Sequence, residues 1–91
     1  MLKMTERKIG RLSSIIYEFE VAGDVLPMHT HGEDDVHITI INKGRFKITT
    51  DTYEKEVSPG QIMDWRVGEP HEIASLEDDA RIVNIFKSFQ D

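Results

Sequence analysis

Short runs in which apolar and polar residues alternate, separated by glycine and proline turns, recur along this chain and strongly restrict its secondary structure. In the run SSIIYEFEVAG, Ile15, Tyr17, Phe19 and Val21 fall on one face of an extended strand. We find no stretch of helical length with apolar residues at the 3.6-residue spacing of an amphipathic helix. The pattern is therefore typical of an all-β chain.

Turn residues divide the chain into about eight short strands, which favours a closed sheet or a sandwich. The clearest boundary is Ser58-Pro59-Gly60, because proline presets φ at the first central position of a turn and glycine accepts a positive φ at the second. Besides the first run and an extended segment at His29, the expected strands are 36–42, 45–50, 53–57, 61–66, 71–75 and 81–89.

The length and charge of the chain limit its organisation and its partners. Its 91 residues predict one domain. The net charge of −6 argues against nucleic acid or an anionic membrane surface as a partner, because both require a basic face. One basic cluster, at Lys3, Arg7, Lys8 and Arg11, lies in a terminal segment that we interpret as a solvated arm.

The chain contains no cysteine, which excludes disulfides, thiolate zinc sites, iron–sulfur clusters and cysteine nucleophiles. Any metal site must therefore use nitrogen or oxygen ligands. No apolar run approaches the roughly 18 residues of a membrane-spanning helix, and the N-terminus lacks the apolar region of a signal peptide. We therefore expect a cytoplasmic protein.

The four histidines are confined to two stretches, Gly23–Gly44 and Gly60–Ser75. His29 and His31 are two residues apart, so on an extended chain both side chains point the same way. In a narrow closed sheet, inward positions on neighbouring strands converge at one end of the interior. We predict one divalent transition metal ion (Fe, Mn, Ni, Cu or Zn), since imidazole suits such ions. The predicted ligands are His29, His31, His37 and His71.

The spacing of these histidines and glycines resembles the two motifs of the cupins. The first cupin motif reads G, five residues, H-x-H, three or four residues, E, six residues, G; here Gly23, His29 and His31 match, and His37 stands six residues before Gly44. The second reads G, five residues, P-x-G, two residues, H, three residues, N. It matches from Gly60 through GQIMDWRVGEPH to His71 and on to Ser75.

The resemblance covers roughly residues 17–86 and implies a small cupin-type double-stranded β-helix, that is, a jelly-roll barrel. Residues 1–91 are then one cupin domain, with 1–14 as an N-terminal arm or strand and 15–89 as the barrel. The chain departs from the motifs at three positions: His37 replaces the glutamate, Arg66 the proline and Ser75 the asparagine. Asp35, four residues after His31, is an alternative or additional ligand at the glutamate position.

Two functions are open at this point. The first is a metal-dependent enzyme with dioxygenase, isomerase or lyase chemistry on a small oxygen-containing ligand; the second is a non-catalytic sensor or binding module. Four neutral imidazoles leave the charge of the ion uncompensated, which favours an anionic ligand. No catalytic residue is assigned, because Glu72 is expected to point out of the barrel and Ser75 is a poor base.

The remaining expectations concern the surface and the partners. Arg66 and Glu69 flank a turn and are expected on the surface, whereas Phe46 and Trp65 are expected in the core or the cavity wall. The resemblance also implies a homodimer, in which the N-terminal segment adds to a sheet edge of the neighbour, since open edges need covering.

Overall fold

A computed structural model of the chain describes residues 2–10, 12–29, 36–65 and 69–87, and within them it leaves the side chains at positions 9, 28, 29, 36, 37 and 87 undescribed. The described residues form nine strands and no helix, so they include no helix of the length and hydropathy that a membrane crossing requires. The strands are β1 (Leu2–Ile9), β2 (Leu12–Phe19), β3 (Val25–His29), β4 (Val36–Lys43), β5 (Phe46–Thr50), β6 (Glu54–Val57), β7 (Ile62–Asp64), β8 (His71–Ser75) and β9 (Ala80–Lys87).

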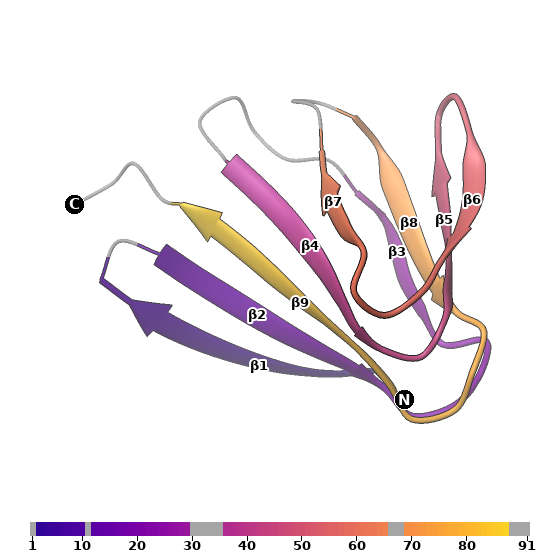
Figure 1. Cartoon of the computed structure of the whole chain (residues 1–91), viewed down its shortest axis with the longest axis horizontal. Coiled ribbons are helices and arrows are strands. Elements are labelled where there is room, and N and C mark those ends of the chain that lie inside the picture. Colours follow the sequence, from indigo (N-terminus) through magenta and orange to yellow (C-terminus); the bar gives the residue numbers. More distant parts are fainter. Residues whose placement is uncertain (1, 11, 30–35, 66–68, 88–91) are drawn as a thin grey trace.

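The strands form two antiparallel sheets that face each other (Figure 1). The five-stranded sheet has the order β1-β2-β9-β4-β7, and the four-stranded sheet has the order β3-β8-β5-β6. Strands far apart in the sequence are neighbours, since β9 lies between β2 and β4 and β8 lies between β3 and β5. This arrangement confirms the expected all-β, jelly-roll fold.

The core lies between the two sheets and follows the period-two alternation of the sequence. In β5, Phe46 and Ile48 are fully buried between half-buried neighbours. They face Phe19 and Ile82 from the five-stranded sheet, which are also fully buried, and the rings of Phe19 and Phe46 meet edge to face at 5.0 Å. Each buried side chain of this size contributes about 1.5–3 kcal/mol of transfer free energy, so this layer holds the sheets together.

The first long run of the sequence ends earlier than expected, and residues 1–14, expected as an arm or a strand, contain a strand. The chain turns at Val21–Asp24, where the backbone N–H of Asp24 donates to the Val21 carbonyl, so β2 ends at Phe19 and Val21 is 51% exposed. Residues 2–9 form β1, which pairs with β2 along its full length as an edge strand. Its exposed Lys3 and Arg7 are typical of an edge, because charged side chains discourage further strand addition.

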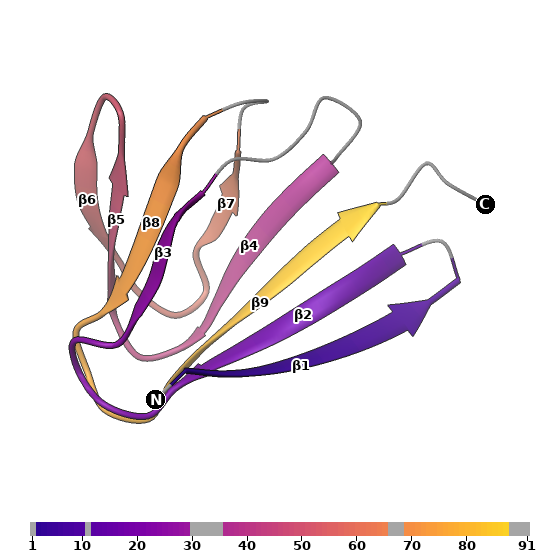
Figure 2. The ribbon, with the colours of Figure 1, turned by 180° about the vertical axis from the view of Figure 1, so that it is seen from behind.

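The beginnings of β4 and β8 and the end of β3 lie at one end of the molecule (Figures 1 and 2). The opposite end holds the β4–β5 turn at Gly44 and the segment after Ser75, where the Leu76 N–H donates to the Arg45 carbonyl. The fold therefore gathers His29, His37 and His71 toward the same end of the sandwich, as their strand positions show.

Candidate metal centre

A β-bulge in β3 sets which residue lies opposite His71. Leu26 pairs with Ile73, and a regular ladder would continue to a pair between Met28 and His71. The register shifts by one residue after Leu26, so that His29 pairs with His71 instead. Pro27 lies inside this interval and has no N–H for the ladder, which explains why the irregularity falls there. Directly opposite residues of an antiparallel pair are on the same face, so the bulge brings two of the predicted ligands together in the backbone.

The His71 side chain is fully buried and fixed in one tautomer. Its ring is 1% exposed, and Nδ1 lies 3.1 Å from the backbone carbonyl oxygen of Glu69. A carbonyl oxygen can only accept a hydrogen bond, so Nδ1 carries the hydrogen and donates it. In the neutral imidazole the lone pair then sits on Nε2, which is the arrangement of a metal-ligating histidine oriented by a backbone carbonyl.

The ring of Trp65 stacks on one face of the His71 ring. The two rings are stacked, with centroids 4.0 Å apart and an angle of 4° between their planes. The indole Nε1–H donates to Thr39 Oγ1 at 2.8 Å, and the Thr39 hydroxyl donates to Asn84 Oδ1 at 2.7 Å. All three polar side chains are buried. The network therefore anchors the indole to β4 and β9, and the indole in turn limits the rotation of His71.

The other predicted ligands are placed only in part. His37 lies in β4, opposite Phe86 of β9 and two residues before the buried Thr39, but its side chain is not described. His31 and the alternative ligand Asp35 lie outside the described residues. The described side chains include only His71 of the four predicted histidines, and among these side chains no group of three His, Asp or Glu could hold a metal ion.

Glu69 is buried, whereas its position beside a turn predicted a place on the surface. Its side chain is only 7% exposed, and it directly precedes Pro70 and His71 at the candidate site. A turn of glycine, glutamate and proline is usually solvated, so the local sequence gave no sign of this burial. A buried carboxylate requires compensation by charge or hydrogen bonds. Glu69 and His71 are the ionisable residues among the buried side chains of the described chain.

The remaining candidates for acid–base chemistry have other roles. Ser75 is buried, but its hydroxyl donates to the Glu77 carbonyl in the following turn. Glu72 alternates with the buried residues of β8 and is half-buried on the other face, as expected. Burial raises the pKa of Tyr17, so its phenol is neutral near pH 7 and serves in packing.

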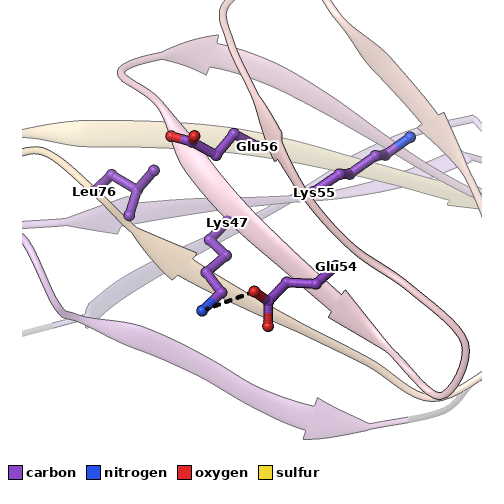
Figure 3. A pocket seen from close by; sticks show the side chains of 5 residues that line it. All are labelled: Lys47, Glu54, Lys55, Glu56 and Leu76. Carbon is purple, nitrogen blue, oxygen red and sulfur yellow. Dashed lines mark ion pairs between the residues drawn. The ribbon is translucent and has the colours of Figure 1, made fainter.

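One pocket on the surface lies away from this centre. It has a volume of about 360 Å³, and it is lined by Lys47, Glu54, Lys55, Glu56 and Leu76 (Figure 3). The Lys47 ammonium and the Glu54 carboxylate form an ion pair at 3.2 Å, and both side chains are well exposed. The pocket contains no histidine, and its charges already neutralise one another, so we do not assign the metal site to it.

Comparison with known proteins identifies the fold. No protein-family model matches the sequence, and no curated protein matches it. Among solved structures, KdgF from Halomonas sp. is similar with a TM-score of 0.83 and 20% identity, over 94% of this chain and 79% of that one. A Cupin 2 conserved barrel domain protein from Salinispora arenicola gives 0.79 and 14%, over 97% and 76%. A predicted oxalate decarboxylase from Thermotoga maritima gives 0.81 and 13%, over 94% and 79%. The chain therefore has the cupin fold.

The network behind His71 can be tested by the substitution Thr39→Val. Valine has a similar shape but no hydroxyl, so the Trp65 N–H and the Asn84 carbonyl oxygen lose their partner inside the core. We expect a loss of about 2 kcal/mol or more in the free energy of unfolding, measured by urea denaturation. Thr49→Val, on the half-buried outer side of β5, is the matched control and should change stability by less than about 0.5 kcal/mol. Equal effects of the two substitutions would contradict the role of the network.

Proposed function

We propose that this chain, which has the cupin fold, binds one divalent transition metal ion and presents it to a small oxygen-containing ligand. The proposed protein ligands are His29, His31, His37 and His71, with Asp35 as an alternative or additional one. The observation that carries the proposal is the pairing of His29 with a buried His71 whose Nδ1 donates to a backbone carbonyl. This arrangement commits Nε2 of His71 to accepting, which is what a metal ligand requires.

The donor set suits the proposed ion. Imidazole nitrogens bind Zn, Cu, Fe and Ni well, and a site without thiolates fits a chain that has no cysteine. When bound, the ion supplies Lewis acidity toward an oxygen atom of the ligand or a binding position for O₂. The ligand would reach it at the end of the sandwich where β4 and β8 begin and β3 ends.

The chain itself contributes orientation and exclusion of water. The Glu69 carbonyl and the stacked Trp65 ring fix the plane of His71, so that its Nε2 is held in one position. The indole also covers one face of the imidazole with an apolar surface and is itself only 7% exposed. Preorganised ligands lower the cost of ordering the site when the ion binds.

We further propose that Glu69 places a carboxylate near the ion, which four neutral imidazoles would otherwise leave without a negative charge. Its backbone carbonyl accepts a hydrogen bond from His71, and its side chain is only 7% exposed. A carboxylate near the ion stabilises the metal-bound state, even where it is not a ligand. With Glu69 included, the site has less need of an anionic ligand than the histidines alone suggested.

We favour a metal-dependent enzyme of dioxygenase, isomerase or lyase type, with a non-catalytic binding module as the alternative. One observation supports the alternative. Apart from Glu69 and His71, the buried polar side chains around the described core are hydroxyls and an amide; those of Thr39, Asn84 and Ser75 are committed to hydrogen bonds within the chain. Few groups therefore remain for proton transfer.

Turnover separates the two functions. Tag-free protein loaded with Fe(II), Mn(II), Ni(II), Cu(II) or Zn(II) should be screened for O₂ uptake and for product with dicarboxylates, diketones and sugar acids. Conversion of any of these by the loaded protein, abolished by a chelator and restored by metal, supports the enzyme. A rise in melting temperature with a ligand that is recovered unchanged supports the binding module.

The metal site can be tested by His71→Ala. Removing this imidazole should lower the metal content from one ion per chain to a small fraction, as measured by elemental analysis of tag-free protein. Cu(II) should quench the fluorescence of Trp65, the only tryptophan, in the native protein, and this quenching should be lost in the variant. Ser75→Ala, on the same face of β8, is the control and should keep the metal. One ion per chain in His71→Ala would reassign the site.

The charge of Glu69 can be tested by Glu69→Gln, which keeps the size of the side chain and the backbone carbonyl bonded to His71. We expect the affinity for Zn(II) to fall by about tenfold, or ~1.4 kcal/mol, because a nearby negative charge is lost. Calorimetric titration would measure it. Glu72→Gln is the control. Glu72 follows His71 directly but lies on the other face of β8, so this substitution should change the affinity far less. Equal losses would indicate only a general effect of net charge.

A further inference from the structure

One row of residues on the inner face of the five-stranded sheet, the side turned toward the four-stranded sheet, leads from the candidate metal centre to the edge strand β1. His37 of β4 pairs with Phe86 of β9, Phe86 pairs with Ser13 of β2, and Ser13 pairs with Lys8 of β1. Residues directly opposite each other in antiparallel strands share a face. Ser13 lies six residues before the core residue Phe19 in the same strand, so this row is on the inner face.

The inner face is open to solvent where it is formed by β1. Leu2, at the beginning of β1, is half-buried and packs against the core. Met4, on the same face, is 62% exposed, and Lys8 is also exposed. β1 and β2 lie at the edge of their sheet that is farther from β5 and β8, so the four-stranded sheet does not cover them here (Figure 1). A ligand can therefore reach this part of the row from solvent.

Ser13 carries a buried hydroxyl that the chain leaves without a partner. The residue is only 7% exposed, yet its hydroxyl forms no hydrogen bond in the structure. Most buried polar side chains are hydrogen-bonded, so an exception needs an explanation. Among the described residues, the one fully enclosed side-chain nitrogen or oxygen without a hydrogen-bond partner is Nε2 of His71. The hydroxyl of Ser13 is therefore still in contact with solvent and available to a ligand.

Lys8, directly opposite Ser13, is a cation without a counter-charge. The other lysines with described side chains each have a charged or an aromatic partner: Lys3, Lys43, Lys47 and Lys55. Lys8 has no such partner. An unpaired ammonium group and an unpaired hydroxyl thus stand side by side on neighbouring strands, and both can donate hydrogen bonds.

We infer that Lys8 and Ser13 together bind a carboxylate at the far end of the ligand that the metal ion holds; the inference rests on the proposed metal site. Directly opposite residues have Cβ atoms about 4.5–5.5 Å apart, so the ammonium and the hydroxyl can donate to the same carboxylate. Hydrogen bonds to a charged group are the stronger kind. The ligand class is an acid with a metal-binding oxygen group at one end and a carboxylate at the other.

The spacing of the strands sets the length of this ligand. The backbones of His37 and Ser13 are two strand intervals of about 4.8 Å apart, or about 10 Å, and Lys8 is one interval farther. The half-buried ring of Phe86 lies between them. A ligand with several methylene groups between its two polar ends, such as adipate, suits this distance and the apolar ring, whereas malonate is too short.

Glu6 restricts where the carboxylate can bind. It is exposed, lies on the same face of β1 as Lys8 and is two residues away. Its negative charge repels an anion, so the carboxylate of the ligand is confined to the row of Lys8 and Ser13. Replacing Glu6 should therefore change the affinity in the opposite direction from replacing Lys8.

The test is calorimetric titration of the Zn(II)-loaded protein with adipate and with hexanoate, which has the same chain length but no second carboxylate. We expect adipate to bind about fivefold more tightly, and this preference should weaken as the ionic strength rises. Lys8→Gln should abolish the preference, Ser13→Ala should reduce it, and Lys8→Arg should keep it. Arg7→Gln is the matched control, because it removes the same charge from the outer face of the same strand.

Two further measurements sharpen the result. Glu6→Gln should strengthen adipate binding. Lys8 is exposed on an edge strand, so its variants should keep the native melting temperature, and a change in affinity then reports a lost contact. If native protein and Lys8→Gln each hold one zinc ion per chain and show equal preferences, or if the native protein shows none, the inference is wrong and the metal site stands. A native chain that binds no metal would overturn both.

Discussion

The position of β9 between β2 and β4 is the constraint on which the rest of the structure depends. Without β9 the five-stranded sheet is two separate pieces, a β1–β2 hairpin and the β4–β7 pair. A two-stranded piece is at best marginally stable in water, so the apolar inner faces can be buried only when all five strands are in register. The same strand carries Asn84, which ends the hydrogen-bond network from Trp65 through Thr39. The register of β9 thus fixes both the core and the support behind His71.

Most of the fold could be predicted from the sequence, because a period of two is visible wherever one face of a strand is buried. The sequence alternates at Phe46 and Ile48, and at His71, Ile73 and Ser75, and the structure buries all five of these residues. β1 was less visible, since an exposed edge strand carries polar residues on both sides. The end of β2 was also missed, because the turn at Asp24 depends on hydrogen bonds that alternation does not show.

The surroundings of the candidate site were harder to predict, because they depend on contacts between distant strands. The burial of Glu69 follows from the packing at one end of the sandwich and not from its local sequence. Asn84 did leave a signal, since it is a polar residue in the apolar stripe between Ile82 and Phe86 and so required a buried partner. The stacking of Trp65 on His71 joins the residue that follows β7 of one sheet to a residue in β8 of the other, and it had no counterpart in the spacing of the motif.

The bulge in β3 has a consequence for how this chain can change during evolution. Which side chain lies across from His71 is set by one inserted position between Leu26 and His29, and not only by the residue types themselves. Loss of the bulge with no change in the length of the chain would leave the histidines in the gene while placing Met28 opposite His71. The pairing of His29 with His71 can thus be gained or lost through a change in the register of β3 against β8. The number and spacing of the histidines in the sequence would not reveal such a change.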